Sequence, residues 1–411
     1  MGRNKKYFGY KPYQYLEPGV DYKKFKLRKA VRDDWAYTIP LSKTEEERFE
    51  NIVEKNIIIS LHEHPCQYPE DISQSPDLFP EGRQFLAYEA LSVSGLDCVF
   101  DNLMDGRTII NTKHGWDWMG TVHDLGMRLC DIAHQDFVIH CKKVEDIIDA
   151  HKTGKLAWVA AIESASCIEN EVDRIDILYG LGIRSLGICY SESNMLGGGM
   201  GETNLDSGLT DFGYDAIKRM NKIGMLIDVG HTNDRTALDT IEASVESVYN
   251  SHSGPAAIAR GHTTSDEVLH AFAEKDGLIG VGGAGRGFRT KKNPVGNIES
   301  YMECVEYCID LMGIDHVGCG PDTLYGDHQD HYRAFQEKWK TGGYGHYVRP
   351  NKPNVDYSLP PGIKDPGYVK GLENPNELVN VARWMIKHGY SDAEIGKIMG
   401  GNALTFLKKV W

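Results

Sequence analysis

Residues 213–243 read GYDAIKRMNKIGMLIDVGHTNDRTALDTIEA. Apolar residues recur with helical spacing in 213–223 and again in 235–243, and the short apolar run MLIDV lies between them at 225–229. Strands that alternate with helices in this way form parallel sheets. The stretch therefore predicts a βα repeat, and the same alternation continues on both sides of it.

From residue 57 onward the chain contains eight such apolar runs, with helical segments between them. A repeat of this length favours a closed (β/α)8 barrel of the TIM type over an open, doubly wound α/β sheet. The predicted strands are 57–61, 97–100, 156–162, 184–189, 225–229, 247–251, 278–281 and 316–320. The predicted helices between them include 143–152, 213–223, 235–243, 266–275 and 298–312.

Two segments lie outside this repeat. The first 32 residues contain ten Lys and Arg but only two acidic residues, Glu17 and Asp21, together with many Tyr. Residues 325–370 are rich in Pro, Gly and Tyr, and long stretches of this kind are commonly lids or binding loops. We therefore expect a basic aromatic arm at 1–50 and a barrel at 51–411, with 325–370 as an insertion or lid segment.

The composition restricts the partners of the protein. Its 411 residues contain 45 Lys and Arg against 59 Asp and Glu, for a formal net charge of -14, which argues against nucleic-acid binding. No apolar run approaches the ~18 residues of a membrane span, and the N-terminus lacks the apolar core of a signal peptide. The nine Cys are scattered without a CxxC pair, which indicates reduced core thiols. We expect a cytoplasmic protein that acts on a small molecule, without nucleic-acid or membrane partners.

Residues of the types that bind metals follow one apolar run after another. The C-terminal ends of barrel strands form the rim where active sites lie, so side chains at these positions converge. His62 and His64 follow NIIISL two residues apart, and an extended chain points both imidazoles to one side. The others are Glu163 after LAWVAAI, His231 after MLIDVG, His252 after SVYNS and Asp322 after HVGCGP.

Taken alone, each of these residues has a structural alternative. A lone His in a strand, such as His231 or His252, is commonly a core histidine with satisfied hydrogen bonds, and Asp322 alone also fits a helix N-cap. Glu163 is harder to explain without a cation, because an unpaired carboxylate is costly to bury. Together, at successive strand ends, the six residues favour a metal centre.

At this point the chain resembles a known family. Residues 207–231, SGLTDFGYDAIKRMNKIGMLIDVGH, and the following SHSGP at 251–255 are similar to the renal or membrane dipeptidases, a branch of the amidohydrolase-like metal-dependent barrels. The resemblance extends over roughly residues 57–411, apart from the stretch after Asp322. Its supporting pieces are GIRSLGICY at 182–190, ARGHTTSDEVL at 259–269 and GLENPNELVNVARWMIKHGYSDAEIGKIMGGNALTFLKKV at 371–410.

The resemblance implies a pair of divalent metal ions, usually zinc, bridged by Glu163. At one ion the family ligands correspond to His62 and the residue two positions later, and at the other ion they correspond to His231 and His252. A carboxylate between two cations reduces their repulsion, and two metals sharpen a water nucleophile at neutral pH.

The resemblance also implies roles around the metals. Asp322 matches the acid that handles the proton of the bridging water, and Arg260 matches the basic residue that receives a substrate carboxylate. The family further implies a homodimer or a higher homo-oligomer.

One departure from the family lies among the ligands. Where the family has His-x-Asp, this chain has His62, Glu63 and His64. A neutral imidazole thus replaces an anionic ligand, which raises the net charge of the site by one and leaves open whether it holds one ion or two. Glu63 is an alternative ligand, but adjacent strand residues point to opposite sides, so we favour His64.

Two further departures concern the substrate. After GIRSLGIC the family has a His that contacts the scissile carbonyl, and here Tyr190 stands in its place, whose phenol can still donate a hydrogen bond to a developing oxyanion. In the loop after LIGVGG the family has an aromatic substrate contact, whereas this chain has Gly285, Arg286 and Arg289. Such arginines fit either an anionic group of the substrate or a solvated surface.

The sequence therefore predicts a metal-dependent hydrolase that cleaves an amide-type bond, in a dipeptide or a related small carboxylate-bearing molecule, through metal-activated water. Asp322 is expected to act as general base and then general acid, with Tyr190 and the metal stabilising the oxyanion. The residues leave open two other reactions. One is hydrolysis of a non-peptide substrate at a lactam, a lactone or a carbon–carbon bond, and the other is a metal-dependent decarboxylation on the same barrel. A catalytically silent barrel used for binding or assembly is a third alternative.

Overall fold

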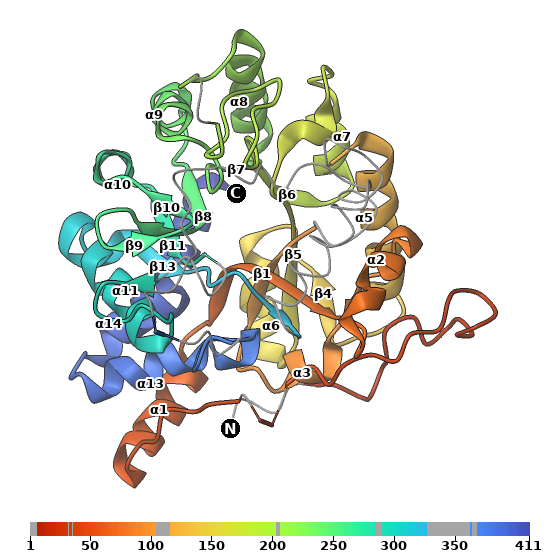
Figure 1. The fold of residues 1–411 in the computed structure, drawn as a ribbon, viewed down its shortest axis with the longest axis vertical. Coiled ribbons are helices and arrows are strands. Elements are labelled where there is room, and N and C mark those ends of the chain that lie inside the picture. The colour runs from red at the N-terminus through yellow and green to blue at the C-terminus, as the bar shows by residue number, and fades with distance from the viewer. Residues whose placement is uncertain are drawn as a thin grey trace.

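The computed structural model describes residues 6–31, 33, 34, 36–103, 116–202, 206–283, 289–326, 362, 363 and 368–411. In this part of the chain, strands in the middle of the molecule are surrounded by helices (Figure 1). The central strands are β1 (Ile59–Gln67), β3 (Cys98–Asn102), β5 (Leu156–Ile162), β6 (Ile183–Gly187), β7 (Leu226–Asp228), β8 (Tyr249–Pro255), β11 (Leu278–Val281), β13 (Val317–Cys319) and β14 (Thr323–Tyr325).

The strands form a (β/α)8 barrel, as the βα repeat predicts. They are hydrogen-bonded in the order β13-β11-β8-β7-β6-β5-β3-β1-β14, and the pairs along this path are parallel. Only residues 320–322 separate β13 from β14, so both ends of this order lie in one short segment of the chain. The sheet therefore curls round until its last strand meets its first.

All eight predicted strands are present, but the first and the sixth were predicted to end too early, and the eighth was predicted without β14. The first prediction ended at residue 61, whereas β1 continues to Gln67 and therefore includes His62 and His64. The eighth-strand prediction ended before β14, and the sixth ended at residue 251, whereas β8 continues to Pro255 and includes His252. Polar residues inside buried strands interrupt the apolar pattern, which explains the early ends. Short additional strands are β2 (Phe85–Leu86), β4 (Val138–His140), β9 (Ala259–Arg260), β10 (Thr263–Thr264) and β12 (Arg289–Thr290).

The five predicted helices are confirmed to within two residues at each end, and four of them have an N-cap residue whose side chain marks the start. The side chains of Thr210, Asn233, Ser265 and Asn297 each accept a hydrogen bond from a backbone amide of the following first turn. The described helices are α1 (Lys43–Lys55), α2 (Ser75–Leu78), α3 (Tyr88–Ser92), α5 (Trp118–Ile132), α6 (Val144–Thr153), α7 (Arg174–Gly180), α8 (Asp211–Ile223), α9 (Asp234–Ala243), α10 (Asp266–Glu274), α11 (Ile298–Met312), α13 (Val379–Lys387), α14 (Asp392–Gly396) and α15 (Asn402–Val410). None of them is long and apolar enough to cross a membrane.

Helix α15 covers the N-terminal ends of the strands. Its Phe406 and Leu407 share a buried cluster with Ile59, Leu226 and Leu278, each of which is the first residue of its strand. A second buried cluster fills the layer between the strands and the surrounding helices. With one end of the barrel closed by apolar packing, the opposite, C-terminal end is the place where polar side chains can gather.

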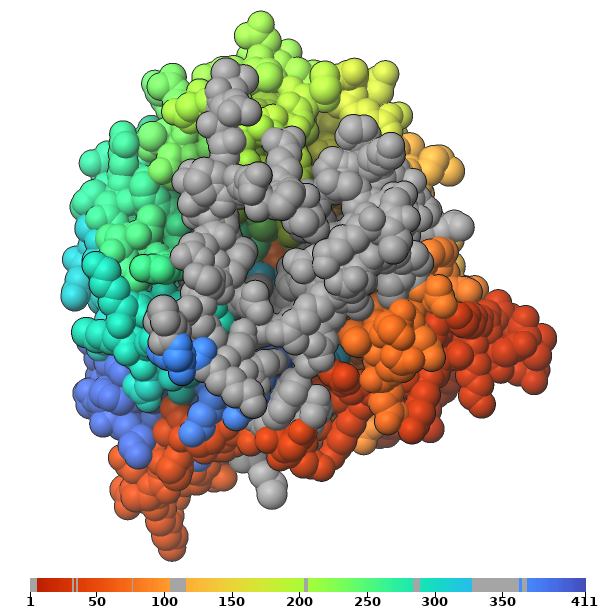
Figure 2. All heavy atoms as spheres, in the orientation of Figure 1, coloured from red at the N-terminus to blue at the C-terminus, as the bar shows by residue number. Residues whose placement is uncertain are grey.

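The described part of the N-terminal arm lies along one edge of the molecule (Figure 2, red). Its Tyr13 and Phe25 pack with Leu78 and Phe85 in a small buried cluster. Most of the predicted insertion at 325–370 lies outside the described residues.

Candidate metal centre

The two histidines of β1 point to the same side of the strand, and the residue between them points to the other side. The rings of His62 and His64 lie 5.2 Å apart. The Glu63 carboxylate instead accepts hydrogen bonds from the Ser60 hydroxyl and from the backbone amide and hydroxyl of Thr323. Glu63 therefore ties β1 to β14 and is turned away from the two imidazoles.

Glu163 comes directly after β5 and lies between the histidines. Its Oε1 is 3.5 Å from His62 Nε2 and 3.4 Å from His64 Nε2. Its other oxygen, Oε2, is 3.0 Å from His231 Nε2. One carboxylate thus faces imidazoles from two different parts of the barrel. Gly187 allows the close approach of β6, since a Cβ there would come within 2.0 Å of the Glu163 carbonyl oxygen.

His231 and His252 form the second pair of imidazoles. His231 follows β7, His252 lies in β8, and their Nε2 atoms are 3.1 Å apart. Two ring nitrogens at this distance repel each other when both present lone pairs. A proton on one of them or a cation between them removes that repulsion.

Asp322 lies in the three-residue break between β13 and β14. Its φ of 60° is in the left-handed region, which non-glycine residues seldom adopt, and its backbone amide donates a hydrogen bond to the His62 carbonyl. The carboxylate Oδ1 lies 3.2 Å from His64 Nε2 and 3.6 Å from His62 Nε2. A strained backbone thus directs this acid towards the β1 pair.

Burial sets the protonation of the cluster. It lowers the pKa of His62 and of His252, and it lowers the pKa of His231 to about 3. Burial also raises the pKa of Glu163, although the nearby His62 and His64 oppose this shift. The imidazoles of His62, His231 and His252 are therefore neutral at physiological pH and keep the lone pairs that metal ligands need.

The residues fit one or two divalent cations. In tetrahedral coordination with bonds of about 2.0–2.1 Å, neighbouring N and O donors lie roughly 3.3 Å apart, close to the separations above. His62 Nε2 and Glu163 Oε1 are buried, and neither makes a hydrogen bond within the described part of the chain. A cation bound between the two atoms would satisfy both of them. Three groups of ligand-type residues lie close enough together among the described residues. One contains His62, His64 and Asp322, a second contains His231, His252 and His262, and a third joins His62 and His252 to Asp228.

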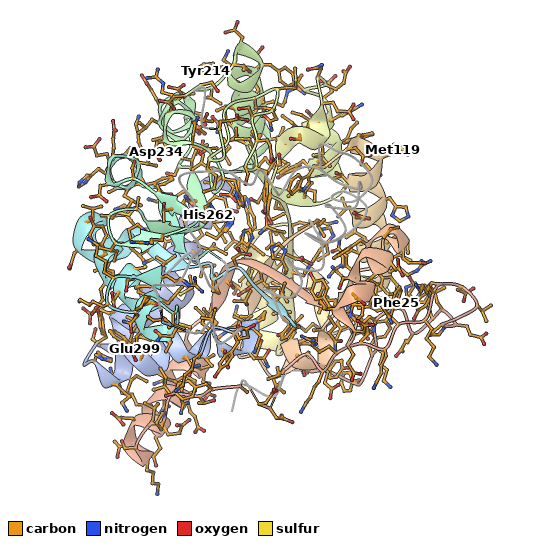
Figure 3. All side chains as sticks on the ribbon, viewed as in Figure 1. Phe25, Met119, Tyr214, Asp234, His262 and Glu299 are labelled. Carbon is orange, nitrogen blue, oxygen red and sulfur yellow. The ribbon has the colours of Figure 1, made fainter. Side chains whose placement is uncertain are left out.

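His262 is a member of the cluster that the sequence did not single out. It lies towards the middle of the molecule in Figure 3, and its ring stacks on that of His231 at a centroid distance of 4.4 Å and an angle of 15°. Its Nε2 contacts the carbonyl oxygen of Gly230. His262 follows no apolar run. Arg260, two residues earlier, is exposed, so the alternation of an extended chain did not indicate that His262 is buried.

Three buried polar residues behind the imidazoles were also missed. The Ser251 hydroxyl lies beside His62 and His252, the Asn102 side chain lies beside His62, and the Asp228 carboxylate accepts a hydrogen bond from the Ser251 amide. Asp228 had a signal, because a carboxylate inside the run MLIDV is as hard to bury as Glu163. For Ser251 and Asn102 the sequence contained none.

The predicted substrate contacts lie in three different settings. Tyr190 is buried, and its ring lies 4.0 Å from that of His231 and 4.7 Å from that of Trp116. Arg260 is exposed on β9, directly opposite Arg289 of β12 in an antiparallel pair. Arg286 lies outside the described residues. The structure thus brings Tyr190 to the cluster, whereas the roles of both arginines stay predictions.

Comparison with known proteins gives a family match over this region. The sequence model of the membrane dipeptidase family, peptidase family M19, matches residues 122–330, which is 209 of the 411 residues. The dipeptidase tcpJ of Claviceps purpurea (strain 20.1) is 24% identical over 290 residues. That alignment covers 70% of this chain but only 58% of the relative, so the chain spans little more than half of its length.

Solved structures share the fold. An amidohydrolase from Pseudomonas aeruginosa superposes with a TM-score of 0.69 at 22% identity, covering 88% of this chain and 99% of that one. A metallo peptidase from Rhodobacter sphaeroides, solved with a phosphinate mimic of the dipeptide L-Ala-D-Ala, gives a TM-score of 0.62 at 18% identity and covers 87% and 100%. At these identities the likeness concerns the architecture of the barrel.

Proposed function

Because the chain belongs to the membrane dipeptidase family, peptidase family M19, we propose that it is a metal-dependent hydrolase of a dipeptide or a related small, carboxylate-bearing amide. The observation that carries this proposal is the position of Glu163. Its two oxygens face different sets of imidazoles, at 3.4 and 3.5 Å on one side and 3.0 Å on the other. A shared carboxylate between two sets of ligands is the arrangement that a pair of cations needs.

The cations are proposed to be zinc. His62 and His64 with one oxygen of Glu163 would hold one ion, and His231 and His252 with the other oxygen would hold the second. A site rich in neutral imidazole nitrogen suits zinc better than magnesium or calcium, which prefer oxygen ligands. Bound ions would polarise the scissile carbonyl and lower the pKa of a water to about 7.

The protein's own groups supply the proton transfers. Asp322 is proposed to take a proton from the attacking water and return it to the leaving amine, because its carboxylate adjoins the imidazoles of β1. The Tyr190 phenol would donate a hydrogen bond to the oxyanion that develops at the carbonyl carbon. Arg260 is proposed to bind the substrate carboxylate, and Arg286 a second anionic group.

The setting of the enzyme is part of the proposal. All nine cysteines are free, and eight of them are buried, which supports a reducing compartment such as the cytoplasm. The net charge of -14 supports a small-molecule substrate over nucleic acid. A homodimer is proposed on the family resemblance.

Metal analysis of three variants tests the function. We expect one or two divalent ions per chain in the wild type, and fewer in Glu163→Gln, because the amide is a poor bridging ligand. Glu377→Gln is the matched control, since this buried carboxylate accepts hydrogen bonds from Tyr37 and Glu373 in another part of the molecule. Asp322→Asn should keep its metal and lose dipeptide hydrolysis by on the order of a hundredfold or more.

Each variant has an outcome that contradicts its assignment. Unchanged metal content in Glu163→Gln would remove that residue as the bridge. Wild-type turnover in Asp322→Asn would remove the proposed proton shuttle. A wild-type chain that binds no divalent ion even when zinc is supplied would overturn the proposed function.

A further inference from the structure

A buried indole group close to the cluster lacks a hydrogen-bond partner. Trp116 is 3% exposed, and its Nε1 makes no hydrogen bond within the part of the chain that the structure describes. An indole nitrogen is a donor only, so its partner has to be an acceptor such as an oxygen atom. A buried donor without an acceptor lowers stability, and such groups are rare in folded proteins. A phenylalanine at this core position would avoid the cost.

The backbone of Trp116 is strained as well. Its φ of 37° lies in the left-handed region, which bulky residues seldom adopt. Backbone strain of this kind persists only where the surrounding structure holds it, and it is concentrated at binding and active sites. The next residue, Asp117, begins α5 by accepting a hydrogen bond from the Gly120 amide. Two unfavourable features thus coincide in one residue whose position the following helix fixes.

Trp116 stands at the end of a row of rings that includes a proposed metal ligand. Its ring lies 4.7 Å from that of Tyr190, which lies 4.0 Å from that of His231. The ring of His262 also lies on His231, at 4.4 Å. One face of an imidazole accommodates a single ring at such distances, so Tyr190 and His262 cover opposite faces of His231. Trp116 therefore lies on the Tyr190 side of the proposed active site.

This row gives the proposed substrate a direction. Arg260, the proposed partner of the substrate carboxylate, precedes His262 by two residues, which span at most about 7 Å. On the other side of His231, Tyr190 is proposed to serve the scissile carbonyl. A dipeptide whose carboxylate lies towards Arg260 then extends its amino-terminal residue past Tyr190, towards Trp116.

We propose that Trp116 is a specificity-determining residue whose indole N–H binds an acceptor oxygen on the amino-terminal side of the scissile bond. The substrate class is then an amide whose acyl part carries such an oxygen, as an asparagine side chain does. A site with a buried donor rejects an analogue that lacks the acceptor, because the donor is then left unpaired. This inference rests on the proposed function for the reaction, whereas the contact itself does not require hydrolysis.

Two enzymes and two substrates test the contact on the full chain supplied with zinc. The dipeptides Asn-Gly and Leu-Gly differ in a side chain of nearly the same shape, and only asparagine provides an acceptor oxygen. We expect the wild type to prefer Asn-Gly by roughly tenfold or more in kcat/KM, and Trp116→Phe, which keeps an aromatic ring beside Tyr190, to lose this preference. A wild type without the preference, or a variant that retains it, would overturn the inference.

Trp411 provides the matched control. Its Nε1 is also buried without a partner among the described residues, but it lies at the end of α15, which covers the opposite end of the barrel, and its ring stacks on Phe100 at 6.4 Å. Trp411→Phe removes this second unpaired donor and should change the substrate preference by no more than about twofold, since it is remote from the cluster. An equal loss of preference in both variants would also overturn the assignment to Trp116.

A spectroscopic readout separates this inference from the proposed function. In metal-free protein labelled with ¹⁵N-tryptophan, the indole N–H signal that is missing in Trp116→Phe should shift when Asn-Gly is added and stay in place with Leu-Gly. Should Trp116→Phe not fold, Trp116→Met fills the space without a donor and serves in both experiments. If neither dipeptide is hydrolysed but the signal responds, the proposed function fails and the contact stands. If both are hydrolysed and the signal does not respond, the contact is wrong and the proposed function stands.

Discussion

Single residues of this protein show how strand geometry assigns chemistry. Successive residues of β1 point to opposite sides of the strand. His62 and His64 therefore face Glu163, whereas Glu63 between them faces Ser60 and Thr323. Burial raises the pKa of Glu63 to about 8, so this side chain is suited to a hydrogen-bonding role. The sequence alone predicted this alternation, and the alternation is the reason for preferring His64 to Glu63 as the ligand.

His140 illustrates a histidine whose role is in stability. It lies on β4, its Nε2 donates to the Gly182 carbonyl, and burial lowers its pKa to about 4. In the unfolded chain the pKa is about 6.5, so on acidification the unfolded state takes up the proton first. The stability that His140 contributes is present above pH 6.5 and is lost as the pH falls to 4.

His140→Gln should therefore flatten the stability profile over this window, since a glutamine amide does not titrate and can still donate to Gly182. We expect the wild type to lose about 1–3 kcal/mol more than the variant between pH 6.5 and 4. Urea denaturation at several pH values measures this difference, and the metal-site histidines contribute equally to both proteins. Parallel profiles would mean that His140 keeps its ordinary pKa in the folded state.

Some site residues could not be found at this scale. Glu163 and His252 follow apolar runs, and a ligand-type residue in such a place is unusual enough to notice. Ser251 and Asn102 are ordinary residues for a strand end, and only their distances from His62 show that they lie beside the cluster. The role of Arg260, matched to the family, stays a prediction, whereas His262, two residues later, stacks on His231 in the cluster and was not singled out.

Among the elements, the last strand of the barrel is constrained both by backbone strain and by close packing. It is interrupted between β13 and β14, and Asp322 stands in the break with a left-handed backbone. Gly320 precedes it at a point where β13 passes very close to β8, because a Cβ there would lie 1.9 Å from the Ser251 carbonyl oxygen. Close packing and backbone strain thus occur together where the proposed acid is positioned.

Gly320→Ala should consequently destabilise the protein by about 3 kcal/mol or more, since the added methyl group meets backbone atoms that cannot rotate away. Gly126→Ala is the control, because this glycine lies on the exposed side of α5 with nothing within 4 Å of its Cβ position. Alanine should stabilise that helix by roughly 0.5–1 kcal/mol. Equal effects of the two substitutions on thermal unfolding would contradict the close approach of β13 and β8.

The elements themselves were largely predictable. Each predicted strand has an apolar run, and four of the five predicted helices have an N-cap side chain at their start, so local chemistry and the final fold agree. The errors occurred where function intervenes, since β1 and β8 continue through histidines that interrupt the apolar pattern. The short pair of β9 and β12 had no such local pattern and was not predicted.

On the scale of the whole molecule, the N-terminal arm is attached through a buried carboxylate. Asp131 of α5 accepts hydrogen bonds from the Tyr10 hydroxyl, the Tyr13 amide and the Tyr88 hydroxyl. Two of these donors belong to the arm and one to the barrel. Ion pairs of Lys23 with Asp77 and of Lys26 with Glu70 are exposed and add little. Asp131 is therefore the expected anchor of the arm.

Asp131→Ala should loosen the arm, because it leaves three donors without this acceptor at a cost of about 1–3 kcal/mol. Trypsin then provides the measurement, since Lys23, Lys24 and Lys26 are exposed cleavage sites that require local opening of the arm. When opening is fast relative to cleavage, a loss of 1.4 kcal/mol raises the cleavage rate about tenfold.

Tyr88→Phe is the matched control for this experiment. It removes only the barrel-side hydrogen bond to Asp131 and keeps the ring that packs edge-on against Tyr10 at 5.3 Å. We expect cleavage near residues 23–26 to accelerate in Asp131→Ala and to stay within about twofold of the wild type in Tyr88→Phe, with the remainder of the barrel resistant in both. Equal acceleration would mean that the Asp131 carboxylate is not the specific anchor of the arm, and that its aromatic packing, such as Tyr10 against Tyr88, contributes most of the attachment.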